Sequence, residues 1–377
     1  MKSIRDVDVK GKRVLLRVDF NVPMENRKVV DDNRIRRSLD TIMHLVKNKA
    51  KIIILTHLGR PSGQIIPGLS TVPLAQKLAE ISKHKVSATD HVIHPKVNEI
   101  IGEMRKGDIL VLGNMRWHNE EESDVDVFAK DLASYGDLYV NDAFGAANRK
   151  HASVYAITKF LPSYTGFLFE SEVTTLSLLL DKPKNPFVVV MGGAKMRGKI
   201  ELIEKIAPKA DKILIGGAIG STFLAAEGKD VSESLVENEV FEKCERLLKS
   251  VGKKLVLPID MVKKDLPNGG FSFQDIGPKT SALYAKEILN ANTVFWNGNL
   301  GHSEEKEYEK GTYAIAEALS KNPNTTVVAG GDTVGFVKSH QLDKSINFIS
   351  TGGGATLQFL AGEKLPGIEA LNGNVDT

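Results

Sequence analysis

Basic side chains follow several short apolar runs in the first half of the sequence, where strands of a parallel sheet are expected to end. Such strands are predicted at residues 13–18, 51–56, 108–112 and 137–140. Ligands of open α/β sheets bind beyond the carboxyl ends of the strands, so the residues after these runs are expected to meet in one crevice. The basic residues found there are Arg17, His57, Arg60, Arg116 and Arg149.

A single arginine after a strand is most often a solvated surface charge. Four basic strand ends in one sheet are harder to explain in that way. Arg34 starts a helix between two of these strands and could join the group. Guanidinium groups match the oxygens of phosphate and carboxylate with two parallel hydrogen bonds. The first half is therefore expected to bind a small polyanion.

Residues 187–199 predict a buried strand, a Gly-Gly turn and the start of a basic helix. Glycine lets a ligand approach the main chain, and a helix N-terminus offers free N–H groups to phosphate. Lys195 and Lys199 are four residues apart and can reach the same anion. A P-loop is not predicted, because Ile200 stands where that motif needs Ser or Thr. A plain strand–helix turn with surface lysines is the alternative for this stretch alone.

The strand–glycine–helix pattern recurs, and the recurrence favours a nucleotide site. Gly-Gly pairs follow apolar runs at 212–215, 325–329 and 346–351, and the run at 293–296 leads into Asn-Gly. A row of such turns predicts backbone clefts for a flat or phosphorylated ligand, without the G-x-G-x-x-G fingerprint. Asp332 is set directly in one turn. Because Mg²⁺ takes carboxylates together with phosphate oxygens, Asp332 is predicted to bind it, with a helix cap as the alternative.

The length of 377 residues exceeds one ordinary core and favours two domains. The pattern places a first domain at 1–160, a bridging helix at 161–180 and a second domain at 181–359. Residues 360–377 form a short tail that could fold onto either half.

Composition points to a soluble cytoplasmic protein. Hydrophobic residues make up 42% and charged residues 26%, as in globular proteins, and the net charge of +3 is too small to indicate a nucleic-acid or membrane surface. The single cysteine, Cys244, fits a reducing compartment. No secretory signal is expected at the N-terminus, and no run reaches the length of a membrane span.

An anion site in one half and a Mg-nucleotide site in the other indicate group transfer. Phosphoryl transfer is favoured, since it needs positioning and charge neutralisation more than covalent chemistry. The kinase loop H-R-D-x-x-x-x-N is absent, and an acceptor that is already an anion, such as a carboxylate, does not need its base. Two alternatives stay open: a catalytically silent anion–nucleotide binding protein, and a different small-molecule kinase acting on a carboxylate.

Collinear motifs along the whole chain make the case more specific. They are RVDFNVP at 17–23, HLGRP at 57–61, NDAFG at 141–145, GGAK at 192–195, DIGP at 275–278, WNG at 296–298, GGDT at 330–333 and TGGGA at 351–355. With these motifs the sequence resembles the phosphoglycerate kinase family over essentially its full length. The resemblance implies two Rossmann-like parallel-sheet domains joined by a bridging helix, with a hinge-closing cleft and a tail that returns to the first domain.

The resemblance also implies the reaction and its ligands. The acyl phosphate of 1,3-bisphosphoglycerate would pass reversibly to Mg-ADP, giving 3-phosphoglycerate and ATP in glycolysis, and a monomer is expected. By position in the motifs, the residues expected to hold the phosphoglycerate are Asp19, Asn21, Arg34, His57, Arg60, Arg116 and Arg149, with Arg17 at the edge of that set.

The same resemblance assigns roles around the nucleotide. Arg34, Lys195, Lys199 and Gly353 are expected at the transferring phosphoryl group, and Asp332 at Mg²⁺. The residues expected to contact the nucleotide are Gly193, Lys195, Lys199, Gly216, Gly217, Asn297, Glu304, Gly330, Gly331, Asp332 and Thr333.

Some positions depart from the family pattern. Gly198 stands where the family usually has Asp, Asn299 where it has Pro, Ser303 where it has an aromatic residue and Asn148 where it has His. Because an acid suits the helix dipole and glycine weakens a helix, Gly198→Asp is expected to stabilise the protein slightly.

Overall fold

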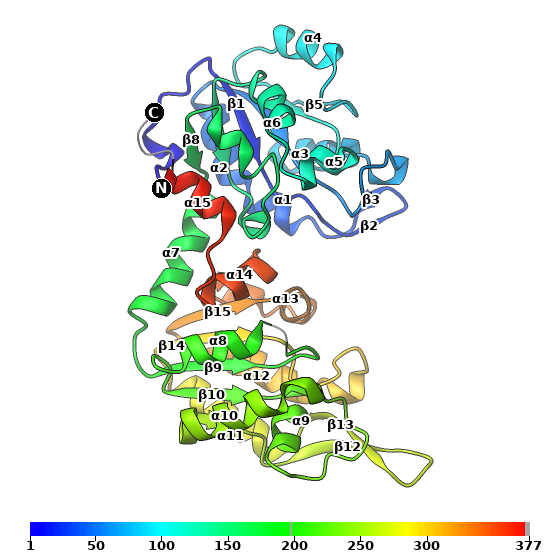
Figure 1. Ribbon diagram of the computed structural model, residues 1–377, viewed down its shortest axis with the longest axis vertical. Coiled ribbons are helices and arrows are strands. Elements are labelled where there is room, and N and C mark those ends of the chain that lie inside the picture. Colours follow the sequence, from blue (N-terminus) through cyan, green and yellow to red (C-terminus); the bar gives the residue numbers. More distant parts are fainter. Residues whose placement is uncertain (197, 374–377) are drawn as a thin grey trace. The chain divides into compact units, whose positions relative to one another are not determined.

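The computed structural model describes residues 1–196 and 198–373 and divides into two compact units (Figure 1). The first unit contains Met1–Thr174 together with the residues from Lys364 onward, and the second contains Thr175–Glu363. Each unit is built on one six-stranded sheet whose neighbouring strands are all parallel. The predicted fold class, two parallel-sheet α/β domains, is therefore confirmed.

The sheet of the first unit has the strand order β5-β6-β4-β1-β7-β8. In that order the strands are Val86–Ala88, Ile109–Val111, Lys51–Leu55, Arg13–Arg17, Leu138–Asn141 and Ser163–Thr165. The four central strands were predicted to within one residue at each end. The two edge strands were missed, because each is only three residues long and carries no clear apolar pattern.

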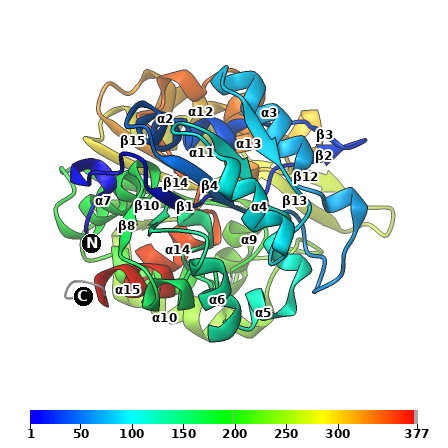
Figure 2. The same ribbon diagram turned by 90° about the horizontal axis from the view of Figure 1, so that it is seen from above.

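Helices cover both faces of this sheet (Figure 2). Because successive residues of a strand point to opposite faces, Val14 packs with α2 and α3 while Leu15 packs with α4 and α6. The helices of the first unit are α1 (Asn33–Arg37), α2 (Leu39–Lys47), α3 (Val72–Ser82), α4 (Pro95–Glu103), α5 (Asn119–Glu122), α6 (Asp126–Ala133) and α15 (Pro366–Gly373). A small hairpin joins β2 (Met24–Glu25) to β3 (Lys28–Val29).

The sheet of the second unit has the order β11-β10-β9-β14-β15-β16. In that order the strands are Leu255–Val256, Lys212–Ile215, Phe187–Met191, Thr293–Asn297, Thr325–Ala329 and Phe348–Ile349. A separate antiparallel hairpin joins β12 (Met261–Asp265) to β13 (Phe271–Ile276). The helices are α8 (Lys199–Ile206), α9 (Gly217–Ala226), α10 (Phe241–Val251), α11 (Pro278–Leu289), α12 (Lys310–Lys321), α13 (Gly331–Ser339) and α14 (Gly354–Leu360). Each predicted glycine turn joins a strand of this sheet to the following helix, as the repeated pattern indicated.

Helix α7 (Phe167–Asp181) begins in the first unit and ends in the second. The helix was predicted to start at residue 161, but β8 occupies residues 163–165. Its start is set by Asp142, whose Oδ1 accepts hydrogen bonds from the backbone N–H groups of Leu168 at 2.9 Å and Phe169 at 3.2 Å. None of the helices in the described ranges is both long and apolar enough to cross a membrane.

The last described helix, α15, packs on the first unit. It contacts β8, and the backbone N–H of Gly367 donates to the carbonyl of Ala147 at 2.8 Å. A Cβ at Gly367 would lie 3.0 Å from the Ala147 Cα, so a larger residue would push the helix away.

Candidate active site

Four of the predicted basic residues meet at the carboxyl ends of the first sheet. Arg17 closes β1, His57 follows β4 by two residues, and Arg116 lies in the turn after β6. Nη2 of Arg17 lies 3.0 Å from Nδ1 of His57, and Nη1 of Arg149 lies 3.4 Å from Nε2 of the same ring. Arg116 donates from Nη1 to the carbonyl of Gly59 at 2.8 Å. These residues therefore meet at the strand ends, as the sequence predicted.

Asp19 connects the helix-borne Arg34 to this cluster. Its Oδ2 pairs with Nη1 of Arg34 at 2.6 Å, and its Oδ1 accepts from the backbone N–H of Asn21 at 3.2 Å. The same Oδ1 lies 4.0 Å from Nε2 of His57. The side chain of Asn21 in turn accepts from the backbone N–H of Gly59 at 2.9 Å. Asp19, Asn21 and Arg34 thus belong to the same corner of the unit as the strand-end arginines.

Burial among like charges shifts the pKa values of this cluster. Burial and the neighbouring Arg149 lower the pKa of Arg116 to about 10, and burial also lowers the pKa of Arg149. The pKa of His57 lies well below its ordinary value, because the ring is fully buried and three arginines lie near it. His57 is therefore neutral at pH 7. Arg60 is exposed and acts on Arg149 through its charge.

Two further buried residues of the cluster were not predicted from the sequence. The carboxylate of Glu121 accepts from the backbone N–H of Ser153 at 2.8 Å and from its hydroxyl at 2.6 Å. The same hydroxyl accepts from Nε of Arg17 at 2.8 Å. Glu121 lies in α5 and Ser153 in a loop, so the strand-end argument that found the arginines does not reach either residue.

The glycine turns of the second unit line one pocket of about 760 Å³. Predicted residues in its lining are Gly193, Lys195, Lys199, Gly217, Asn297, Glu304, Gly330, Gly331, Asp332, Thr333 and Gly353. Gly216 does not line this pocket. A Cβ there would lie 2.4 Å from Cδ2 of Leu300, so Gly216 serves close packing beneath the pocket. Thr333 accepts from the backbone N–H of Gly298 at 2.8 Å and ties two of the turns together.

The pocket also has an apolar side that the sequence did not indicate. Met261 of β12 and Phe273 of β13 line it, together with Leu235 and Leu357. The hairpin is antiparallel and short, so it does not follow the strand–helix alternation on which the prediction depended. The combination of apolar side chains and glycine turns suits a ligand with a flat ring and a phosphate chain.

Lys199 is the buried cation of this pocket. Its Nζ donates to the carbonyl of Gly192, and a Cβ at Gly193 would lie only 2.7 Å from Nζ. Burial lowers the pKa of Lys199 to about 8, although the charges of Asp332 and Glu237 oppose the shift. Lys195 is exposed at the same turn.

Asp332 lies in the first turn of α13, but the N-cap of that helix is Gly330. The helix-cap alternative for Asp332 is therefore not what the backbone shows. Within the described ranges no group of three or more His, Cys, Asp or Glu side chains could hold a metal ion by itself.

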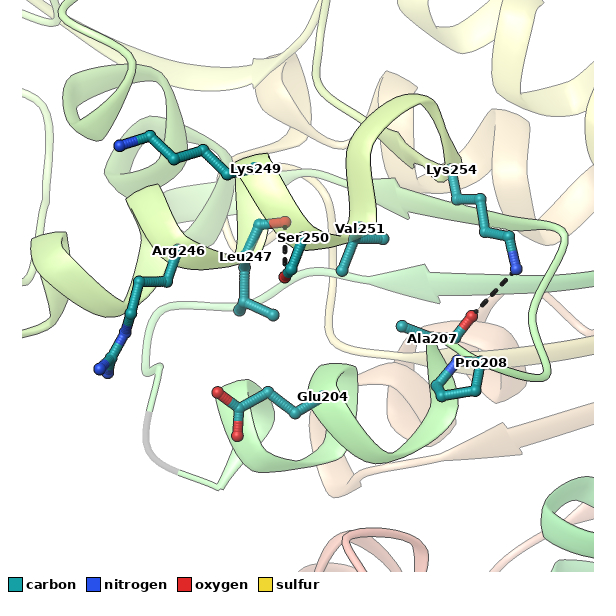
Figure 3. A pocket seen from close by; sticks show the side chains of 9 residues that line it. All are labelled: Glu204, Ala207, Pro208, Arg246, Leu247, Lys249, Ser250, Val251 and Lys254. Atoms are coloured by element: carbon teal, nitrogen blue, oxygen red, sulfur yellow. Dashed lines mark hydrogen bonds between the residues drawn. The ribbon is translucent and has the colours of Figure 1, made fainter.

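A second groove, of about 960 Å³, lies between α8 and α10 (Figure 3). Glu204 and Arg246 line it from opposite helices, and Lys254 donates to the carbonyl of Ala207 at 3.3 Å. None of the predicted site residues lies in its lining, so the chemistry indicated by the sequence belongs to the glycine-lined pocket and the arginine cluster.

Gly198 is the N-cap of α8 and has a φ of +75°. A Cβ there meets nothing within 4 Å, so the backbone conformation, and not a lack of space, favours glycine. A residue with a side chain costs about 1–2 kcal/mol in this left-handed region. The expectation that Gly198→Asp stabilises the protein assumed ordinary helical geometry, which the positive φ of Gly198 does not provide.

Two α/β units with parallel sheets, one with a buried arginine cluster and one with a glycine-lined pocket containing a buried lysine, are what a small-molecule kinase requires. Comparison with known proteins makes the class specific. The family model described as phosphoglycerate kinase matches residues 4–363. The chain belongs to the phosphoglycerate kinase family.

Individual relatives match along nearly the whole chain. The phosphoglycerate kinase of Clostridium kluyveri is 41% identical in an alignment of 391 positions, gaps included, that covers 98% of each protein. The solved structure of phosphoglycerate kinase from Coxiella burnetii superposes with a TM-score of 0.88 at 34% identity, and that from Pyrococcus horikoshii OT3 with 0.89 at 28% identity. Each superposition covers 99% of both chains.

The backbone at Gly198 predicts a stability effect. We expect Gly198→Ala to lower the free energy of unfolding by about 1 kcal/mol, because alanine is strained at a positive φ. The matched control is Gly335→Ala in the middle of α13, where a Cβ also meets nothing within 4 Å. That control should gain about 0.5–1 kcal/mol in urea unfolding. Equal gains for both variants would contradict the role of the Gly198 backbone.

The buried lysine predicts a pH dependence of stability. Between its folded pKa of about 8 and its ordinary value of 10.5, Lys199 binds fewer protons when folded than when unfolded. Wild-type stability therefore rises with pH across that window. We expect the stability of Lys199→Met relative to wild type to fall by up to about 3 kcal/mol between pH 7 and pH 10. Lys205→Met, at an exposed position of the same helix, should show no such slope in urea unfolding.

Proposed function

We propose that this protein catalyses the reversible transfer of the acyl phosphate of 1,3-bisphosphoglycerate to ADP, giving 3-phosphoglycerate and ATP in glycolysis. Membership of the phosphoglycerate kinase family supports this reaction. The observation that carries the proposal is the presence, in one chain, of an anion-attracting cluster and a separate glycine-lined pocket with a buried lysine.

The arginine cluster of the first unit holds the phosphoglycerate in this proposal. Burial lowers the pKa of Arg116 to about 10 and also lowers the pKa of Arg149, and each of these two arginines lies close enough to Arg17 to feel its charge. An anion that enters the cluster relieves the repulsion among them. The remaining contacts come from Asp19, Asn21, His57, Arg34 and Arg60.

The pocket of the second unit holds the nucleotide. The base lies against the apolar side formed by Met261 and Phe273, and the phosphates lie on the glycine turns, where backbone N–H groups are accessible. Glu304 lies in the lining and is assigned to the ribose hydroxyls. Lys195 and Lys199 supply positive charge to the phosphates.

Asp332 is assigned to Mg²⁺. A single carboxylate beside a phosphate site suits this ion, which commonly takes one or two carboxylates and completes its shell with phosphate oxygens and water. Asp332 lines the same pocket as Lys199, and its charge opposes the lowering of the pKa of Lys199, which supports the assignment. When bound, Mg²⁺ neutralises phosphate charge.

In the transfer step the bond between the acyl oxygen and phosphorus breaks, and a terminal oxygen of ADP forms the new bond to phosphorus. The leaving group is the carboxylate of 3-phosphoglycerate, so no protein base is required. Charge on the three equatorial oxygens is met by Arg34, Lys195 and Lys199. Gly353 has a φ of +53° and lines the pocket, so its backbone can approach the moving group.

We further propose a cytoplasmic monomer that acts on small molecules and binds neither nucleic acid nor membranes. The net charge of +3 and the composition support this assignment. The coupled assay with 3-phosphoglycerate and Mg-ATP tests the reaction directly. Turnover with 3-phosphoglycerate supports the proposal. Binding without turnover indicates a silent binding protein, and turnover only with another carboxylate indicates a different kinase.

Arg34 gives the sharpest test of the transfer step. A structural arginine at this position would pair with the preceding acids, but Asp32 pairs with Arg36, and Arg34 pairs with Asp19. We expect Arg34→Ala to stay folded, to bind 3-phosphoglycerate within a few-fold of wild type, and to lose at least about a thousandfold in kcat. Arg34→Lys should recover only part of that loss, because a point charge lacks the guanidinium geometry.

Arg36→Ala is the matched control, since Arg36 lies on the same helix in an exposed ion pair worth at most about 1 kcal/mol. Its kcat should equal that of wild type. A normal kcat with a raised KM in Arg34→Ala would move Arg34 from the transfer step to substrate binding.

Asp332 gives a separate test of the metal assignment. We expect Asp332→Asn to weaken binding of Mg-ADP at least about tenfold while leaving the affinity for 3-phosphoglycerate unchanged, because a neutral amide is a poor Mg²⁺ ligand. Titration calorimetry with each ligand measures both affinities. Asp343→Asn, in the short turn beyond α13, serves as the control. Equal losses for both ligands would contradict the assignment.

A further inference from the structure

The contacts of His57 fix which ring nitrogen carries its proton. A guanidinium group only donates hydrogen bonds, so Nδ1 of His57 must accept from Nη2 of Arg17 at 3.0 Å. The neutral ring then carries its proton on Nε2. The reverse tautomer would set two donors against each other at 3.0 Å, whereas the contact of Nε2 with Arg149 is longer, at 3.4 Å.

In the part of the chain that the structure describes, the protonated Nε2 faces another donor and has no acceptor within hydrogen-bonding distance. Nη1 of Arg149 is the nearer group, and the carboxylate oxygen Oδ1 of Asp19 lies 4.0 Å from Nε2. The carboxylate of Asp19 already has a partner, because its other oxygen, Oδ2, pairs with Arg34. Two donors that converge on the same space are satisfied by one anionic oxygen between them.

The orientation of Arg17 is fixed by hydrogen bonds that involve Ser153 and Glu121, to which no role has yet been assigned. Its Nε donates to the hydroxyl of Ser153 at 2.8 Å, and its Nη1 donates to the carbonyl of Val18. The hydroxyl of Ser153 donates its own proton to Oε1 of Glu121 at 2.6 Å, and the backbone N–H of Ser153 donates to Oε2 at 2.8 Å. The side chains of Glu121, Ser153 and Arg17 are all 0% exposed, so water does not compete for these bonds.

We propose that Glu121 and Ser153 are positioning residues which, through Arg17, hold His57 in the Nε2-protonated tautomer and so present a neutral N–H donor to an anionic oxygen of the substrate. The hydrogen bond made by one imidazole nitrogen sets the protonation of the other. In this chain Ser153 donates to Glu121 and accepts from Arg17, and Arg17 donates to His57. The part of this inference that concerns the substrate rests on the proposed function.

The alternative is that Glu121 only balances the charge of Arg17. Charge balance requires a nearby carboxylate, but it does not require the hydroxyl of Ser153, which is neutral. Ser153→Ala therefore separates the two explanations, because it breaks the link and leaves both charges in place.

The experiment uses the ¹⁵N-labelled full-length protein and reads the ring nitrogens of His57 by NMR. The His57 signals are identified by their loss in His57→Gln. Wild type should show an unprotonated Nδ1 and a protonated Nε2. In Ser153→Ala, Arg17 is no longer held, and we expect a mixture of tautomers together with an affinity for 3-phosphoglycerate lowered about tenfold. The affinity for Mg-ADP should not change.

Ser163→Ala is the matched control, because Ser163 is buried in the same unit and its hydroxyl bonds only the carbonyl of Leu161, at 2.8 Å. It should keep the wild-type tautomer and affinity. Glu121→Gln is a second variant that weakens the same link and should shift the tautomer in the same direction, which covers the case of an unfolded Ser153→Ala.

The results for the His57 tautomer and for 3-phosphoglycerate binding test the positioning chain and the proposed function separately. A wild-type ring protonated on Nδ1, or a wild-type tautomer and affinity in both Ser153→Ala and Glu121→Gln, overturns the inference. A tautomer shift in a protein that binds no 3-phosphoglycerate supports the positioning chain and overturns the proposed function instead.

Discussion

The fold of the first unit depends on keeping a fully buried arginine satisfied. Arg17 ends the central strand β1, and its side chain is 0% exposed. An unpaired charge in that position would be very costly, so each of its three nitrogens needs a hydrogen-bond acceptor. Ser153, the carbonyl of Val18 and His57 accept one hydrogen bond each from Nε, Nη1 and Nη2, and the carboxylate of Glu121 accepts from the hydroxyl of Ser153. The loop that follows β7 is therefore fixed to the centre of the sheet by a polar chain.

The second unit handles its buried charge differently. Lys199 begins α8 beside a glycine turn that leaves no room for a Cβ at Gly193, and the acids Asp332 and Glu237 act to raise its pKa. Burial outweighs them. With its pKa lowered to about 8, Lys199 keeps its charge at neutral and lower pH and loses it as the pH rises above about 8, and a phosphate placed against it would raise that pKa. In both units the cost of a buried cation is offset in part by the ligand that the proposed function supplies.

The sequence predicted the parts of the protein that follow local rules. Strand ends of a parallel sheet must meet, so the order of apolar runs was enough to bring Arg17, His57 and Arg116 together. Glu121 and Ser153 were missed because a buried acid on a four-residue helix and a serine in a loop carry no periodic signal. The positive φ of Gly198 was missed because glycine in a sequence does not state which backbone conformation it adopts.

The partner of Arg34 shows where sequence reasoning reaches its limit. Neighbouring acids made a local ion pair the obvious structural alternative, yet the local pair forms with Arg36, four residues after Asp32 on one helix face. Arg34 points to Asp19, fifteen residues away in the chain, and only the packing of α1 beside the end of β1 brings the two together. Asp19 also lies near His57. One carboxylate therefore lies between Arg34 and His57, and the proposed recognition of an anion there depends on geometry that no single segment of the sequence contains.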